Sequence, residues 1–213
     1  SKIIKFSRKP HKNLNTGNLC MSGIYIINKK LLKFIKKNKF QDFSKNFLPT
    51  ILKNRRRIFG YRSREYVKDI GTPDRLAKTK SEINSIKYRK GNLKSKIPAI
   101  FIDRDGVINK DKYNFKYQNP FNFIEGCFKA VKKINSKGYL SIVVTNQPAV
   151  AKGFITLEKL KNDFKKIESI FGKKKCYFDR IYYCPCHPSK GFVGELKKYK
   201  RNCSWRKPNN GMF

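Results

Sequence analysis

Two aspartates separated by a single residue stand directly after an apolar run. Asp103 and Asp105 follow the hydrophobic start of the segment AIFIDRDGVIN. Because like charges this close repel each other, a bound cation is needed to stabilise them, and Mg²⁺ prefers oxygen ligands of this kind. The same repulsion favours a proton on one of the two groups, which can then act as a general acid. The pair therefore predicts a nucleophile, Asp103, able to form an acyl phosphate, beside an acid/base group, Asp105.

Polar and basic side chains later in the chain have the chemistry of a phosphate site. Thr145 and Asn146 end a second apolar run, and their hydroxyl and amide groups suit phosphate oxygens. Arg206 and Lys207 precede a proline, with a helix expected after them, and a cation there would neutralise both a phosphate and the aspartates. Each signal is weak alone, but their order along the chain makes the combination more specific.

The elements that must position these residues alternate between strands and helices from residue 98 onward. Continuous apolar runs predict buried strands at 99–102, 140–146 and 178–184, and amphipathic stretches predict helices at 126–139 and 156–172. Thr156 is the expected N-cap of the second helix. This alternation predicts an α/β fold with a Rossmann-like parallel sheet covered on both faces. Ligands bind at the carboxyl ends of the strands in such sheets.

The first part of the chain, residues 1–81, has a different pattern. Residues 22–37 predict a strand, a turn and an amphipathic helix, alternating residues at 55–69 suggest strands, and Pro73 opens a further helix. Residues 82–97 are polar and basic and lack an apolar stripe, so they are expected to be a linker. The predicted organisation is an incomplete α/β segment, a linker, and a second domain at 98–213.

The charge of the chain is unusual. Its 213 residues hold 51 Lys+Arg against 14 Asp+Glu, a formal net charge of +37. Such a charge suits a nucleic-acid or anionic-membrane partner, but the lysines are spread from end to end, which favours a general compositional drift towards lysine. We expect no specific nucleic acid and no membrane as partner, while a phosphorylated substrate would be attracted. The oligomeric state stays open.

No run approaches the ~18–20 apolar residues of a membrane span. The first residues, SKIIKFSRKP, also lack the apolar core of an export signal. We therefore expect a cytoplasmic protein whose cysteines are reduced thiols or metal ligands. Cys184, Cys186, His187 and Cys203 are sufficient for a tetrahedral structural zinc site. The alternative is a loop held by packing alone, with Trp205 in the place of the metal.

Three ordered motifs, FIDRDGVIN, VVTNQ and RKPNNGM, resemble the haloacid-dehalogenase (HAD) superfamily of phosphatases. Within it they are most similar to the histidinol-phosphatase-like group, which includes heptose bisphosphate phosphatases. The resemblance covers about residues 98–213. It implies Mg²⁺-dependent hydrolysis of a phosphomonoester through an aspartyl phosphate, with the 7-phosphate of D-glycero-D-manno-heptose 1,7-bisphosphate as the expected target. Histidinol phosphate is the alternative substrate, and a basic nucleic-acid-binding module is the alternative of another class.

The resemblance also implies residue roles. Asp103 is the nucleophile and Asp105 the acid/base, with Mg²⁺ held by the Asp103 carboxylate and the Asp105 backbone carbonyl. The remaining roles are phosphoryl binding by Thr145 and Lys207, and assistance in substrate binding by Asn146 and Arg206. A further acidic motif of the family does not occur before Phe213, so we expect the chain as it stands to hold Mg²⁺ poorly and to be weakly active or inactive.

The cysteine loop departs from the pattern of its relatives, which have a Cys-x-His pair followed by a Cys-x-Cys pair. Here Cys186 stands at the histidine position and Trp205 at the last cysteine position. His187 is the expected substitute ligand, although it is adjacent to Cys186. Zinc binding and its absence are both left open by the sequence.

The first part contains GNLCMSGIYII, DFSKNFLPTIL and REYVKDIGTPDRLAK, which resemble the C-terminal part of sugar-phosphate nucleotidyltransferases. In that family the aspartate matching Asp69 helps bind the catalytic metal and the nucleotide sugar. The glycine-rich nucleotide-binding loop of the family is missing, so we expect no nucleotidyl transfer from this chain. A phosphatase fused to a nucleotidyltransferase would join two successive steps towards a nucleotide-activated heptose for lipopolysaccharide or another surface polysaccharide.

Overall fold

The computed structural model describes residues 2–3, 6, 19–83, 85–110 and 121–213. The first two residues of the predicted GNLCMSGIYII motif and one position of the predicted linker therefore lie outside the described residues.

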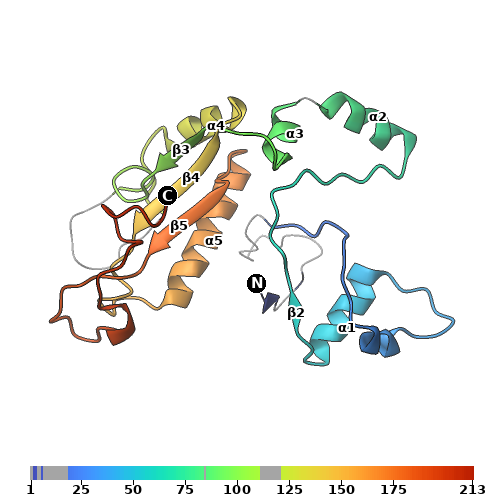
Figure 1. Cartoon of the computed structure of the whole chain (residues 1–213), viewed down its shortest axis with the longest axis horizontal. Helices are drawn as coiled ribbons and strands as arrows, with labels where there is room; N and C mark the ends of the chain where they lie inside the picture. Colours follow the sequence, from blue (N-terminus) through green and yellow to red (C-terminus); the bar gives the residue numbers. More distant parts are fainter. Residues whose placement is uncertain (1, 4–5, 7–18, 84, 111–120) are drawn as a thin grey trace.

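Three parallel strands form the sheet of the second half of the chain. The strands β3 (Ala99–Ile102), β4 (Leu140–Asn146) and β5 (Arg180–Cys184) lie in the order β3-β4-β5 (Figure 1). In this register Asn146 lies opposite Cys184, so β4 and β5 end at the same edge. The α/β fold and the parallel sheet predicted from the alternating runs are confirmed.

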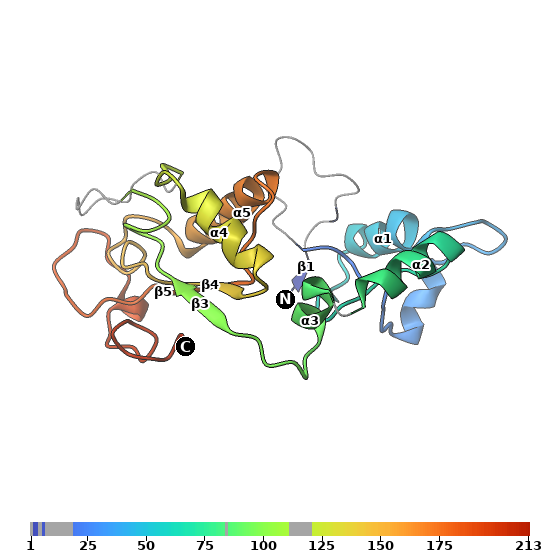
Figure 2. The ribbon, with the colours of Figure 1, turned by 90° about the horizontal axis from the view of Figure 1, so that it is seen from above.

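Both long helices of this half lie on one face of the sheet (Figure 2). These are α4 (Cys127–Ser136) and α5 (Leu157–Lys173). Since both crossovers run in the same direction across the sheet, both bring their helix to the same face. The buried core on this face includes Ile102, Val131, Val143, Leu160, Ile167 and Phe171.

The ends of these helices follow from local sequence. Thr156 caps α5, because its hydroxyl accepts a hydrogen bond from the Lys159 backbone N–H at 3.0 Å, as predicted. Gly138 has a φ of 82°, a left-handed conformation that favours glycine, and it turns the chain from α4 into β4. The sequence therefore fixes both the start of α5 and the exit from α4.

The opposite face of the sheet is covered by irregular chain in the described residues. Val144, Cys184 and Met212 form a buried cluster there. The sequence predicted covering on both faces, but on this face the cover is the segment after η3 (Lys197–Tyr199). The prediction of a helix after Lys207 is wrong, since residues 208–213 contain turns and bends but no helix.

The first part of the chain has a small core of its own. Phe47, Leu48 and Ile51 are buried there, contributed by η2 (Phe43–Phe47) and α1 (Leu48–Lys53). The two-residue strands β1 (Lys2–Ile3) and β2 (Ile58–Phe59) pair antiparallel.

Two expectations for this part need correction. Residues 22–27 form no strand, and the predicted helix after them is the short 3₁₀ helix η1 (Lys29–Phe34). Ile24 is 74% exposed and Ile26 fully exposed, so no neighbouring strand covers this run among the described residues. Of the strands suggested at 55–69, only β2 forms.

The helix expected from Pro73 is confirmed as α2 (Pro73–Glu82), whose N-cap is Thr72. The predicted linker, in contrast, contains the helix α3 (Ile86–Gly91). Ser85 caps α3 by accepting a hydrogen bond from the Tyr88 backbone N–H at 3.2 Å. No described helix is both long and apolar enough to cross a membrane.

Candidate active site

The carboxyl edge of the sheet brings Asp103 and Lys207 together from distant parts of the sequence. Asp103 follows β3, and its Oδ2 lies 2.5 Å from the Lys207 Nζ. The same ammonium donates to the Val144 backbone carbonyl of β4 at 3.1 Å. The predicted nucleophile and the predicted phosphate-binding cation therefore meet at the edge where ligands bind in sheets of this kind.

Asn146 anchors the loop that carries this lysine. Its side-chain oxygen accepts a hydrogen bond from the Lys207 backbone N–H at 3.0 Å, and its amide nitrogen donates to the Lys207 carbonyl at 3.1 Å. Arg206 points elsewhere, because its guanidinium donates to the Cys186 carbonyl at 3.1 Å. The structure therefore gives Asn146 a positioning role and places Arg206 towards the loop after β5.

Asp105 is surrounded by hydrogen-bond donors. Its Oδ1 accepts from the Arg104 Nε at 3.0 Å and from the Asn109 amide at 3.0 Å. Its Oδ2 accepts from the Gln147 amide at 2.6 Å. The Gln147 amide also donates to the Thr145 hydroxyl at 2.9 Å. A continuous chain of hydrogen bonds thus joins the predicted acid/base to the predicted phosphate-binding threonine.

The two aspartates differ in access to solvent. The Asp103 side chain is 42% exposed and the Asp105 side chain 30% exposed, whereas Arg104 beside it is only 6% exposed. A substrate phosphate can therefore approach Asp103, while Asp105 is held by its neighbours. This difference suits a nucleophile beside a fixed proton donor.

Sequence reasoning missed three residues of this network. Arg104, Asn109 and Gln147 were not assigned a role, although Gln147 follows the Thr-Asn pair directly. The signal available for Arg104 was its place between the two aspartates, since a buried cation there offsets their repulsion. Asn109 is the last residue of the FIDRDGVIN motif, but its contact with Asp105 depends on the turn after β3, which brings it back to that side chain.

The donor set at this edge is suitable for Mg²⁺. Asp103 offers a carboxylate that is partly open to solvent, and hard oxygen ligands are those that Mg²⁺ selects. In the described part of the chain, no third acidic group joins the two aspartates in a possible metal-ligating group. The residues present would therefore supply some of the oxygen ligands that Mg²⁺ needs.

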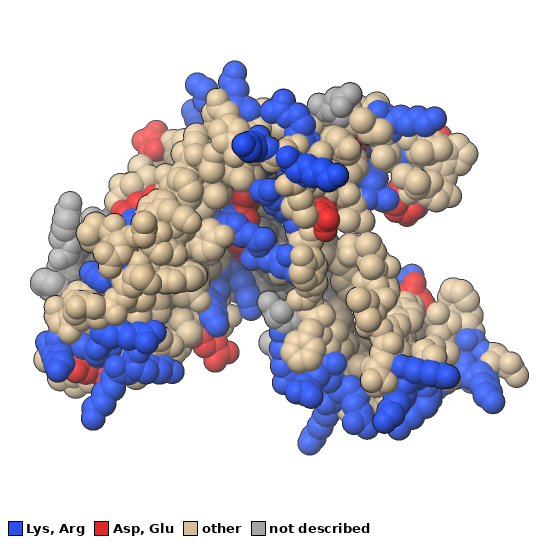
Figure 3. Space-filling view, in the orientation of Figure 1, with Lys and Arg blue, Asp and Glu red and all other residues tan. Residues whose placement is uncertain are grey.

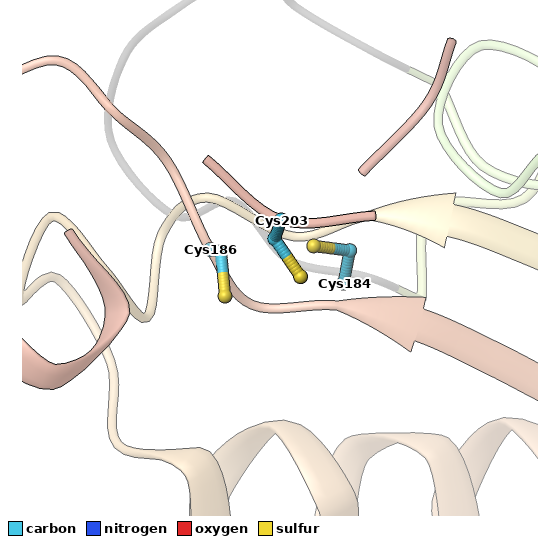
Figure 4. A group of neighbouring side chains, drawn as sticks. All are labelled: Cys184, Cys186 and Cys203. Atoms are coloured by element: carbon cyan, nitrogen blue, oxygen red, sulfur yellow. The ribbon is translucent and has the colours of Figure 1, made fainter. Parts of the chain in front are cut away.

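The thiols of Cys184, Cys186 and Cys203 form a separate cluster. Their sulfur atoms all lie within 4.8 Å of one another. Figure 4 shows Cys184 at the end of β5, Cys186 just beyond it, and Cys203 on the segment that returns past them. Three of the four predicted zinc ligands are therefore brought together.

Neither His187, the expected substitute ligand, nor Trp205, the alternative occupant of the metal's place, lies where the sequence suggested. His187 is not in the group, and its Nδ1 accepts a hydrogen bond from the Ser189 backbone N–H at 3.2 Å. Trp205 is 46% exposed and packs edge-on against Tyr182, with ring centroids 6.5 Å apart, so it does not fill the place of a metal. Burial, and then the charge of Arg206, lower the pKa of His187.

The three thiols differ in acidity. Burial raises the pKa of the Cys184 thiol to about 12. Burial acts to raise the pKa of Cys203, but hydrogen bonds from the Trp205 backbone N–H and from the other two thiols, together with the charge of Arg201, outweigh it, so the pKa is lowered. A metal that binds here would have to displace protons, so its affinity would rise with pH.

Asp69 lies in the first part of the chain, in an exposed turn. It accepts a hydrogen bond from the Gly71 backbone N–H at 2.9 Å and forms an ion pair with Arg75. The structure therefore assigns Asp69 local contacts that stabilise the start of α2. Figure 3 shows lysines and arginines distributed over both parts of the visible surface, as the even spread of lysines in the sequence indicated.

The second half thus brings an aspartate pair, a buried threonine and a lysine to the carboxyl edge of a parallel α/β sheet, and its sequence relatives are phosphatases. The first part is similar to another class, since the family model for nucleotidyl transferases matches residues 1–85.

The particular relatives of the second half are heptose bisphosphate phosphatases. The D-glycero-beta-D-manno-heptose-1,7-bisphosphate 7-phosphatase of Vibrio cholerae is 40% identical over 116 residues, which cover 54% of this chain and 60% of that protein. The Escherichia coli K12 enzyme of the same name is 34% identical over 117 residues, covering 55% and 59%. A Burkholderia mallei relative, named for the alpha anomer, is 37% identical over 116 residues, covering 54% and 59%.

A solved structure described as D,D-heptose 1.7-bisphosphate phosphatase from B. bronchiseptica, complexed with magnesium and phosphate, aligns with a TM-score of 0.45. The two chains are 26% identical, and the alignment covers 55% of this chain and 59% of that one. The chain spans about three fifths of the length of the curated relatives it matches.

Proposed function

We propose that residues 98–213 belong to a Mg²⁺-dependent phosphatase that removes the 7-phosphate of D-glycero-D-manno-heptose 1,7-bisphosphate. The contact between Asp103 and Lys207 supports this most directly, because it joins a nucleophile and a cation across 104 positions of sequence at the ligand-binding edge. The names of the sequence relatives support the heptose substrate over histidinol phosphate.

The reaction begins with Asp103. One of its carboxylate oxygens attacks the phosphorus in line with the leaving oxygen, forming an aspartyl phosphate. Asp105 protonates the leaving sugar oxygen, and then takes a proton from the water that hydrolyses the aspartyl phosphate. Lys207 and Thr145 bind the transferring phosphoryl oxygens. Gln147 holds Thr145 and Asp105 in place, because its amide donates a hydrogen bond to each.

A bound Mg²⁺ would neutralise charge between Asp103 and the phosphate, held by the Asp103 carboxylate and the Asp105 backbone carbonyl. Residues of the chain position the other groups of the site. Asn146 fixes the Lys207 loop, and Arg104 holds Asp105 at the sheet edge.

The test is Asp103→Asn, assayed with Mg²⁺ for phosphate release from heptose 1,7-bisphosphate and from histidinol phosphate. Assays on this chain and on a form extended past Phe213 distinguish two causes of missing activity, namely a wrong choice of substrate and an incomplete metal site. We expect turnover of the heptose substrate to disappear in the variant, while Asp74→Asn, an exposed aspartate of α2, keeps it. Faster turnover of histidinol phosphate would replace the substrate, and full activity in Asp103→Asn, together with polynucleotide binding at physiological salt, would favour the binding-module alternative.

We also propose that Cys184, Cys186 and Cys203 hold a structural zinc ion through their thiolates. Three sulfurs within 4.8 Å of one another support this, with the fourth ligand from a group outside the cluster. Elemental analysis should find stoichiometric zinc in the wild type and in Cys20→Ser, an exposed cysteine elsewhere. Cys203→Ser should lose the metal and melt at a lower temperature, and a zinc-free wild type whose melting a chelator leaves unchanged would disprove the site.

For the first part, we infer a role next to the phosphatase in the same cytoplasmic route to a nucleotide-activated heptose. The match of residues 1–85 to nucleotidyl transferases supports this placement. We expect no nucleotidyl transfer from the 213 residues alone, and an assay for release of pyrophosphate from nucleoside triphosphate and heptose 1-phosphate tests that expectation.

A further inference from the structure

Lys90 is buried although it carries a charge, and it lies far in sequence from the residues it contacts. Its side chain is 8% exposed. The ammonium donates to the Tyr139 carbonyl at 3.0 Å, the Tyr177 hydroxyl at 3.2 Å and the Asp179 Oδ2 at 2.9 Å. An ammonium has three protons to donate, so these three acceptors match its full capacity. It also lies 4.8 Å from the centroid of the Tyr177 ring.

The receiving side, meaning the groups that accept hydrogen bonds from Lys90, lies at the amino end of the sheet. Tyr139 immediately precedes β4, and Asp179 immediately precedes β5. The Asp179 Oδ2 also accepts a hydrogen bond from the Ser141 backbone N–H at 2.8 Å, so the sheet itself holds the carboxylate that Lys90 contacts. Ile86 lies near Gly138, where an added Cβ would come within 3.1 Å of its side chain. This end of the sheet is opposite to the edge that carries Asp103 and Lys207.

The other side of α3 contacts the first part of the chain. The Tyr66 backbone N–H donates to the Gly91 carbonyl at 3.0 Å, and a side chain at position 91 would meet the Tyr66 backbone at 2.6 Å. The Tyr66 ring packs edge-on against Tyr88 with centroids 5.6 Å apart, and its hydroxyl donates to Glu82 at 2.5 Å. In Figure 1, α3 accordingly lies between the first part and the amino ends of the strands.

We propose that α3 is a clasp that fixes the nucleotidyltransferase-like part to the amino end of the phosphatase-like sheet, through the Lys90 ammonium in its site of Tyr139, Tyr177 and Asp179. A flexible linker would leave its polar side chains in water, and a buried ammonium with three acceptors is specific to one docked position. The clasp holds the two parts in one orientation, with the phosphatase site facing away from the junction.

The experiment measures hydrogen exchange by mass spectrometry on the whole chain. Lys90→Met keeps the length of the side chain and removes its charge. Lys87→Met makes the same change on an exposed position of the same helix and serves as the control. We expect amides of 85–92, and the Tyr66 amide that bonds to Gly91, to exchange at least tenfold faster in Lys90→Met and at the wild-type rate in Lys87→Met.

A second variant approaches the clasp from the receiving side. Asp179→Asn removes the negative charge while retaining an oxygen that can accept from Ser141. It should accelerate exchange over the same residues, and the double variant Lys90→Met/Asp179→Asn should add little to either single change, because both remove one interaction. If Lys90→Met exchanges like Lys87→Met, or if the effects of the two changes add fully, α3 is not a clasp.

Discussion

Replacing Lys207 by methionine should separate catalysis from stability. The ammonium lies 2.5 Å from the Asp103 Oδ2, but the two side chains are 23% and 42% exposed, so solvent screens their attraction. Partly exposed ion pairs contribute about 1 kcal/mol or less to folding. A chain of this length would lose about 2–4 °C of melting temperature for that amount. The folded state of Lys207→Met should therefore survive.

The effect on turnover should be much larger. A donor aimed at charge that develops in the transition state is worth about 2.7–4 kcal/mol, which corresponds to about 10²–10³ in kcat. Phosphate release in the presence of Mg²⁺ by the form extended past Phe213, with thermal melts in parallel, measures both effects. Lys190→Met, an exposed lysine on the loop after β5, controls for the change in net charge. If Lys207→Met turned over within tenfold of the wild type, Lys207 would not face the transferring phosphoryl group.

Three further changes test the electrostatics and packing. Gln147→Leu should destabilise the fold by about 2–4 kcal/mol in denaturant titrations, because it removes one hydrogen bond to a carboxylate and one to a hydroxyl; a loss below about 0.5 kcal/mol would contradict the network. The Tyr66 hydroxyl, and then a nearby lysine, lower the pKa of Glu82 to about 2. Its contribution to stability is therefore present above pH 4.5 and lost as pH falls towards 2. In Glu82→Gln the melting temperature should fall less steeply than in the wild type over this range of pH. Burial raises the pKa of Glu168 against the opposing charge of Arg62, so its contribution is full at low pH and lost as pH rises through the folded value. Glu168→Gln should raise the melting temperature at pH 7 and leave it unchanged at pH 4, and equal shifts at both values would refute the assignment.

The second half could be read from the sequence because its signals are local. The runs that form β3, β4 and β5 are mostly apolar, and the cap of α5 is one threonine. Once a parallel sheet is inferred, its geometry places the residues after β3 and β4 at one edge. That Asp103 and Thr145 lie at the same edge was predictable on that basis, whereas the approach of Lys207 to Asp103 was expected from the family resemblance.

What the sequence did not show depends on contacts between distant residues. The helix α3 has no apolar stripe, and its Lys90 is buried only because acceptors 49 to 89 positions away converge on it. Asn109 ends the FIDRDGVIN motif, but the motif alone did not show that the turn after β3 brings its amide back to Asp105. The exposed Ile26 shows the reverse case, in which an apolar run predicts a strand but finds no partner among the described residues.

The position of α3 has a consequence for how material moves between the two parts. Under the proposed function, the sugar 1-phosphate released at the Asp103 edge would emerge at the far end of the sheet from the helix that anchors the first part. It would therefore have to diffuse through the surrounding water before a second enzyme could use it. An unlabelled sugar 1-phosphate added to a reaction coupled to a separate nucleotidyltransferase should accordingly dilute a labelled intermediate completely.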